Sequence, residues 1–255
     1  MGLFEAALLL TLGCVAGIVS VIAGGAGILV YPGLVFLGLS PLSANATTNV
    51  ALAPAVFVAV WADRHRLPAM GAPLALVAAM AFLGTLIGAV SLLATGEALF
   101  RLFVPAMLGL STLLFWQAPE IHRRLSREGG ERYGARLQAA FLASGVYSGY
   151  FGTGFGIVLL ALLRLAGVAS LMRANQLKNV IGAVASLAGL GFFLGGTTLV
   201  SMPHFAAVAA GNILGGYAGA RLAHALPAEA MRRFVIGFGG VLTLVFVWRY
   251  WLASG

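Results

Sequence analysis

The sequence predicts an all-α polytopic membrane protein, and three observations lead to this prediction. Of the 255 residues, 61% are hydrophobic and only 9% are charged, whereas soluble domains carry about 25% charged residues. Several apolar runs exceed about 18 residues, the length needed for a membrane-spanning helix. A glycine- and asparagine-containing pattern occurs once in each half of the chain. The apolar runs are continuous, whereas a membrane β-barrel requires alternation of apolar and polar residues.

The repeated pattern joins a glycine-rich stretch to a pair of asparagines. Gly25-Ala26-Gly27, followed by Asn45 and Asn49, returns as Gly154-Phe155-Gly156, followed by Asn175 and Asn179. Later in each half, Gly84-x-x-x-Gly88 matches Gly211-x-x-x-Gly215. Internal repeats with helices broken at matched positions are typical of secondary transporters, whose substrate site lies where the broken helices meet.

Each half is expected to contain one broken or re-entrant helix pair and three transmembrane helices. The second limb of each broken helix has about a dozen residues, roughly 18 Å, which is too short for a hydrocarbon core of about 30 Å. Each broken element is therefore expected to double back. Four prolines fall inside or early in expected helices and are expected to kink them: Pro32, Pro54, Pro73 and Pro105. The expected helices are 3–22 with 28–39, 43–62, 69–93 and 98–117 in the first half, and 136–151 with 156–167, 173–195, 203–223 and 228–252 in the second.

The basic residues favour the doubling-back arrangement over simple crossings. If both broken elements double back, 12 of the 15 Lys and Arg residues lie on the cytoplasmic side, 2 lie outside and 1 lies within the membrane. Simple crossings would give 8 inside and 6 outside, a weaker bias than the positive-inside rule expects. Doubling back makes the halves inverted-topology repeats and places both termini outside the cytoplasm. The expected units are repeat 1–118, a basic cytoplasmic linker 119–135, and repeat 136–255.

The two glycine breaks are candidate anion sites. Gly24-Gly25-Ala26-Gly27 and Gly152-Thr153-Gly154-Phe155-Gly156 each precede a short expected helix. The first amides of a helix have no intrahelical partner and lie at the positive end of the helix dipole, so they attract anions. Tight helix packing through small residues is the alternative interpretation, but the matched positions favour a site.

Polar residues follow each break within an apolar helix. Asn45 and Asn49 are four residues apart, as are Asn175 and Asn179, so each pair shares one helix face. Their amides suit an oxyanion, although a hydrogen bond that only stabilises the bundle is the alternative.

Lys178 is the only lysine in the chain, and its counterpart in the first half is Thr48. None of the seven acidic residues is expected near the membrane centre, so a substrate anion is the expected counter-charge for this lysine. The alternative is a lysine whose side chain extends to the cytoplasmic interface.

These motifs give the chain a resemblance to the TauE/SafE family over nearly its whole length. The resemblance rests on the first glycine break followed by Gly38-Leu39-Ser40-Pro41 and residues 44–49, and on the second copy at 152–156 and 175–179. It implies transport of sulfite, sulfonates or related small anions, commonly outward, across the bacterial cytoplasmic membrane.

The sequence therefore predicts a secondary transporter, acting as an exporter of a small sulfur-containing anion by alternating access. An anion channel is the main alternative, followed by a membrane enzyme or a non-transporting assembly partner. No metal is expected, because Cys14 is the single cysteine and the four histidines lack metal-ligand spacing. No cofactor is expected either, and the absence of a Walker motif argues against ATP. Most basic residues lie in short loops beside apolar runs, where they report orientation, so no nucleic acid is expected. Membrane lipid is an expected partner, and a homodimer is one possible assembly. The predicted substrate-binding residues are Gly24, Gly25, Gly27, Asn45, Thr48, Asn49, Gly152, Thr153, Gly154, Gly156, Asn175, Gln176, Lys178 and Asn179.

Overall fold

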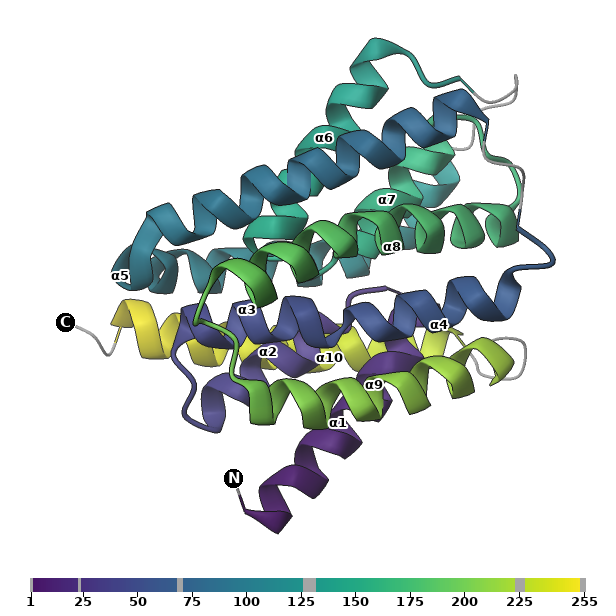
Figure 1. Ribbon diagram of the computed structural model, residues 1–255. Coiled ribbons are helices and arrows are strands. Elements are labelled where there is room, and N and C mark those ends of the chain that lie inside the picture. Colours follow the sequence, from purple (N-terminus) through teal and green to yellow (C-terminus); the bar gives the residue numbers. More distant parts are fainter. Residues whose placement is uncertain (1, 23, 68–70, 126–131, 223–227, 253–255) are drawn as a thin grey trace.

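The computed structural model describes residues 2–22, 24–67, 71–125, 132–222 and 228–252, and all regular structure within these ranges is helical (Figure 1). Five of the helical segments are long and apolar enough to cross a membrane, which confirms the predicted class. The helices are α1 (Leu3–Ile22), α2 (Gly27–Phe36), α3 (Pro41–Ala51), α4 (Ala53–Asp63), α5 (Ala72–Leu125), α6 (Ala135–Tyr150), α7 (Phe155–Leu165), α8 (Leu171–Gly196), α9 (Met202–Leu222), α10 (Ala228–Val247) and the π-helix η1 (Trp248–Leu252).

The expected helix 43–62 is divided into α3 and α4 at Leu52. Pro54 lies in the first turn of α4, where its missing N–H is tolerated. The Ala55 amide that follows donates to Oδ1 of Asn212 in α9 at 2.8 Å. The proline therefore interrupts the helix as expected, and a buried asparagine from the second half supports the interruption.

The expected helices 69–93 and 98–117 are the two arms of α5. They meet at Gly96, whose φ of 72° and ψ of 166° are not helical. The second arm continues to Leu125, beyond the expected end at 117. Residues 119–125 of the expected linker therefore lie in a helix, and residues 126–131 lie outside the described part of the chain.

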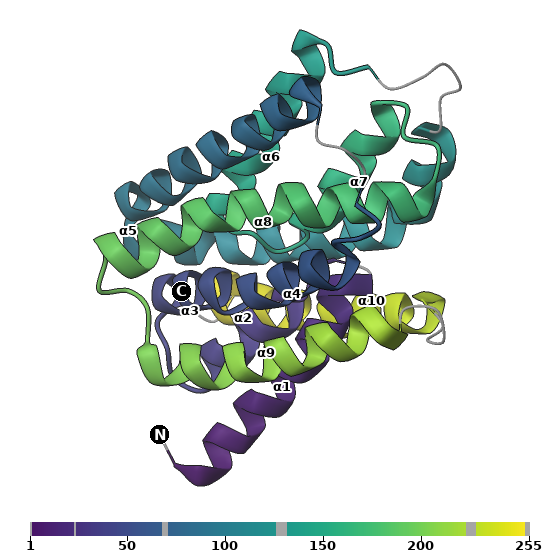
Figure 2. The same ribbon diagram turned by 45° about the vertical axis from the view of Figure 1, so that its right-hand side comes forward.

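Two pairs of helices approach each other closely enough for their backbones to touch. In Figures 1 and 2, α6 and the first arm of α5 lie at the top, α1 and α9 lie at the bottom, and α8 lies between these layers with α3 and α4. Gly84 and Gly88 of α5 face α6, while Gly211 and Gly215 of α9 face α1. A Cβ at any of the four would overlap a backbone carbonyl oxygen of the facing helix. Small residues thus bring the first helix of each half against a helix of the other half.

Gly88→Ala is expected to lower the free energy of unfolding by about 1–3 kcal/mol, because the added methyl group overpacks the interface. Its Cβ would overlap the Val146 carbonyl and lie 2.8 Å from the Tyr150 amide nitrogen. The matched control is Gly191→Ala in α8, where nothing lies within 4 Å of the new Cβ. Thermal unfolding in detergent should show a lower Tm for Gly88→Ala and an unchanged or higher Tm for Gly191→Ala, since alanine favours helix. Equal effects of the two substitutions would contradict a packing role for Gly88.

Hydrogen bonds show where the first broken helix begins and ends. Glu5, near the start of α1, contacts His204 Nε2, near the start of α9, at 3.0 Å. Ser43, near the start of α3, donates to the carbonyl of Leu199, just before α9, at 2.7 Å. The start of α1 and the chain after α2 therefore lie at one end of the molecule. Figure 1 places both chain termini at this end.

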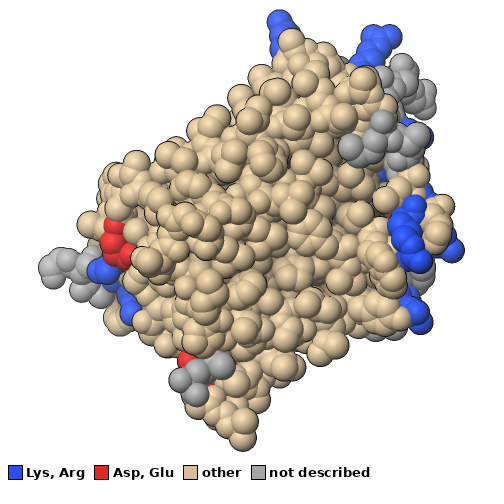
Figure 3. Space-filling model, in the orientation of Figure 1, with Lys and Arg blue, Asp and Glu red and all other residues tan. Residues whose placement is uncertain are grey.

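The second broken helix also returns to the end at which it started. The Arg132 amide, just before α6, donates to the Ala166 carbonyl, just after α7, at 2.8 Å. The second arm of α5 runs from Gly96, near the end that holds the termini, to Leu125, near this opposite end. Figure 3 shows most of the visible basic side chains at the end away from the termini, while the middle of this face is uncharged.

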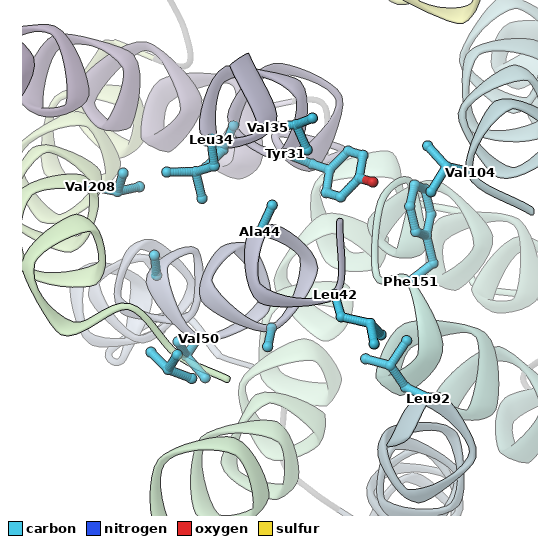
Figure 4. Close-up of a cluster of buried hydrophobic side chains, with 14 of the residues drawn as sticks. Tyr31, Leu34, Val35, Leu42, Ala44, Val50, Leu92, Val104, Phe151 and Val208 are labelled. Atoms are coloured by element: carbon cyan, nitrogen blue, oxygen red, sulfur yellow. The ribbon is translucent and has the colours of Figure 1, made fainter. Parts of the chain in front are cut away.

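The core beside the first broken helix is a cluster of apolar side chains that comes from both halves (Figure 4). It packs α2 and α3 against α5, α9 and the end of α6. Its labelled members are Tyr31, Leu34, Val35, Leu42, Ala44, Val50, Leu92, Val104, Phe151 and Val208.

Candidate functional site

The two glycine breaks meet in the middle of the molecule. Gly24 and Gly25 join α1 to α2 with φ values of 71° and 103°, and Gly152 and Gly154 join α6 to α7 with values of 75° and 87°. These positive φ values favour glycine. A Cβ on Gly24 would lie 3.1 Å from the Cα of Gly156. The backbones of the two breaks therefore touch, and no side chain fits between them.

A cavity of about 100 Å³ lies beside this meeting point. A cavity of this size has room for water or a small solute. Both halves of the chain contribute to its walls. The predicted residues that line it are Gly24, Gly25, Gly27, Thr48, Asn49, Gly152, Thr153, Gly156, Lys178 and Asn179.

Lys178 extends from α8 toward the end of α1. Its side chain is 3% exposed, and its Nζ lies 3.5 Å from the carbonyl oxygens of Ser20 and Val21. Carbonyls in the last turn of a helix lack intrahelical partners and form the negative end of its dipole. Among the described residues that line the cavity, Lys178 is the only ionisable one. The lysine therefore points into the site and not to the membrane interface.

Two polar side chains at the cavity have groups without hydrogen-bond partners among the described residues. Thr153 is 2% exposed, and its buried Oγ1 has no such partner; the same holds for Nδ2 of Asn49. Leaving a buried polar group unpaired costs about 1–3 kcal/mol, so such groups are suited to a ligand or water. Ser111 and Tyr147 both donate to the Thr153 carbonyl, which fixes the backbone of the second break.

Four predicted residues lie outside the cavity lining. The Asn45 amide donates to the Tyr150 carbonyl at 2.8 Å, and Gly154 caps the start of α7. Asn175 has a buried Oδ1 with no partner among the described residues, and Gln176 is 8% exposed. A direct role for these four in substrate binding stays a prediction.

Sequence reasoning missed Ser20 and Ser186, which also line the cavity. For Ser20 the repeat contained a signal, because Ser20-x-x-x-Gly24 matches Ser148-x-x-x-Gly152. Both serines lie one turn before the break and reach the same cavity. No comparable signal existed for Ser186, whose counterpart in the first half is apolar Val56.

Aromatic side chains lead from the cavity toward the end of the molecule that holds the termini. Phe151 lines the cavity, and its ring packs on Tyr31 with centroids 5.4 Å apart and on Phe100 at 6.3 Å. Tyr31 also packs against Phe246 at 6.1 Å, which in turn packs against Tyr250 of η1 at 5.3 Å. These five residues form an aromatic wall on this side of the cavity.

Comparison with known proteins assigns the chain to a family of membrane proteins. The family model described as "Sulfite exporter TauE/SafE" matches residues 9–246. A probable membrane transporter protein of Haemophilus influenzae is 27% identical over 252 residues, covering 97% of this chain and 96% of the relative. The probable membrane transporter protein YfcA of Escherichia coli K12 is 27% identical over 233 residues, covering 89% and 84%. No solved structure matches the chain. The match over 9–246, together with the apolar helices long enough to cross a bilayer, shows that this multi-pass membrane protein belongs to the TauE/SafE family.

Proposed function

We propose that the protein is a secondary transporter that carries a small anion by alternating access. One observation carries the proposal: a buried lysine with no carboxylate partner among the described residues lies in a cavity where two glycine-broken helices meet. A charge inside the membrane marks a substrate pathway or a binding partner. The relatives from Haemophilus influenzae and Escherichia coli, both named as probable membrane transporters, support the same function.

We infer further that the two halves are inverted-topology repeats. The first broken helix begins and ends at the terminus end of the molecule. The second begins and ends beyond the far end of α5. Broken helices that open to opposite ends, with a shared cavity between them, suit a carrier that exposes one site alternately to either side. The basic end would face the cytoplasm under the positive-inside rule, with both termini outside and the chain in the bacterial inner membrane.

The family description favours export of a sulfur-containing anion such as sulfite or a sulfonate. An anion channel is the second candidate, because it could use the same polar cavity. The aromatic wall between the cavity and the terminus end favours a carrier, since a carrier must close one side of its site at a time.

Counterflow in proteoliposomes is expected to separate the two candidates. Purified protein would be reconstituted, and efflux of labelled sulfite or methanesulfonate would be measured with and without unlabelled anion outside. A carrier should release label several-fold faster when external substrate is present, because the loaded site returns faster than the empty one. A channel would give no such acceleration.

Empty liposomes and the packing control Gly191→Ala complete this design, since the latter should behave as wild type. Saturable efflux without acceleration by external anion would contradict alternating access. Anion transport would be contradicted if efflux were no faster than from empty liposomes for every solute tested: sulfite, taurine, sulfoacetate, acetate and chloride.

A further inference from the structure

We propose that the carried species is a monovalent anion and that the site rejects divalent anions of the same size. This inference rests on the proposed transport function and narrows its substrate class. It follows from the sum of the formal charges and helix dipoles around the cavity.

Formal charge in the cavity comes from one residue. Lys178 contributes one positive charge, and the other described lining residues are neutral. Three described acidic residues lie elsewhere: Glu5 contacts His204, Glu97 accepts from Ser40, and Asp63 ends α4. Glu120 lies near the C-terminal end of α5. The described residues that line the cavity include no carboxylate to offset the lysine.

The helix dipoles at the cavity nearly cancel one another. The starts of α2 and α7 lie at the breaks, and each contributes about half a positive charge. The ends of α1 and α6 lie at the same breaks, marked in the cavity wall by Ser20 and Ser148, and each contributes about half a negative charge. The Lys178 ammonium is held on the carbonyl end of α1. The sum is close to a single positive charge.

A single positive charge in a desolvated site is neutralised by a single negative charge. A divalent anion would leave one net charge buried, and a neutral solute would leave the ammonium unpaired; both are costly at low dielectric. We therefore expect a preference of at least about 100-fold for the monovalent form over an isosteric divalent one.

The remaining lining also suits an anion with one apolar side. Hydroxyl and amide groups of Asn49, Thr153 and Asn179 can bind oxygen atoms, and the Thr153 hydroxyl is free among the described groups. Leu52, Val56 and Leu159 form an apolar part of the wall. A small sulfonate with a short alkyl group matches both surfaces.

Three solutes of nearly equal shape test the inference: methanesulfonamide with no charge, methanesulfonate with one negative charge and sulfate with two. Each would compete against labelled methanesulfonate for uptake into proteoliposomes containing the full chain. The concentration of unlabelled methanesulfonate that halves the uptake should be at least about 100-fold lower than the concentration of sulfate or methanesulfonamide with the same effect. For the uncharged variant Lys178→Met, whose uptake is expected to be lost, binding is measured as the rise in Tm that each solute causes in the purified protein. The variant should lose this order and bind methanesulfonamide at least as well as methanesulfonate.

The outcomes distinguish this inference from the proposed function. If sulfate competes as well as methanesulfonate in the wild type, the monovalent preference is wrong while anion transport stands. If the order of the three solutes is the same in Lys178→Met, the lysine does not set the charge preference. If methanesulfonate and sulfate are both taken up no faster than by empty liposomes, the anion-carrier function and the inference fall together.

Discussion

Lys178→Met should abolish anion transport and at the same time raise the stability of the substrate-free protein. Lys178 is 3% exposed in the wild type, and among the described residues its ammonium contacts only two carbonyl oxygens, each at 3.5 Å, so its burial is poorly compensated. Methionine removes this cost, and replacing buried charge by apolar groups stabilises by about 1–4 kcal/mol where the new side chain packs well. Loss of the counter-charge to a bound anion should weaken binding by about 3–5 kcal/mol, which is about 150- to 5,000-fold.

Flux into proteoliposomes and thermal unfolding in detergent measure the two effects separately. A gain in stability with a loss of transport identifies a residue retained for function. Unchanged transport in Lys178→Met would exclude the lysine from the substrate site. A loss of stability would assign it a structural role, as a bridge between α8 and the end of α1.

The internal repeat supplies a matched rescue for this substitution. Thr48 is the counterpart of Lys178 and lines the same cavity from the other half of the chain. The double variant Lys178→Thr with Thr48→Lys returns one cation to the cavity from the opposite side. It should recover part of the transport that Lys178→Thr alone loses, because the net charge of the site is restored. No recovery would show that the position of the charge matters more than its presence.

Gly24→Ala is expected to cause the second large loss, in both folding and transport. Its Cβ would lie 3.1 Å from the Cα of Gly156, so the two breaks would have to move apart. Gly24 also has a φ of 71°, where alanine costs about 1–2 kcal/mol. Together with overpacking of about 1–3 kcal/mol, the expected loss in unfolding free energy is about 2–5 kcal/mol.

Gly38→Ala provides the control for backbone strain. Gly38, which follows the end of α2, has a positive φ of 96°, and nothing lies within 4 Å of an added Cβ. This control variant should lose only the part of the unfolding free energy that is due to backbone strain, and its transport rate should stay unchanged. Chemical denaturation and flux assays compare the two variants, and equal losses would refute the close approach of the breaks as the cause.

Much of the architecture could be predicted because a membrane-spanning helix is specified by its own local sequence. A run of apolar residues long enough to span the bilayer specifies a helix without reference to the rest of the chain. Glycine breaks interrupt such runs visibly, so both short helices, α2 and α7, were predicted. The interruption near Pro54 was predicted in the same way, because a proline in a helix interior removes a backbone hydrogen bond. Pro32 and Pro105, in contrast, lie inside α2 and α5 with no break in the helix at either position. The role of Asn212, which bonds the Ala55 amide from another helix, has no local signal.

The cavity residues were predictable to the extent that the repeat marked them. Lys178, Asn49 and Asn179 were identified because a polar residue inside an apolar helix is costly, and the glycines because they recur. The periodicity of a helix places Asn45 and Asn49 on one face, but only the packing of α3 decides that Asn49 lines the cavity while Asn45 bonds the Tyr150 carbonyl.

The sequence by itself determined that this protein is helical and membrane-embedded, that it has two related halves, and which polar residues lie inside apolar helices. These properties depend on composition and short-range spacing. Only the tertiary structure decided that the two glycine breaks touch, that the Lys178 ammonium lies on the carbonyls of α1, and that an aromatic wall lies beside the cavity. The contact between Gly24 and Gly156 and that between Lys178 and Ser20 join residues more than a hundred positions apart. Their geometry is set by how close the helix backbones can approach, which no local pattern specifies.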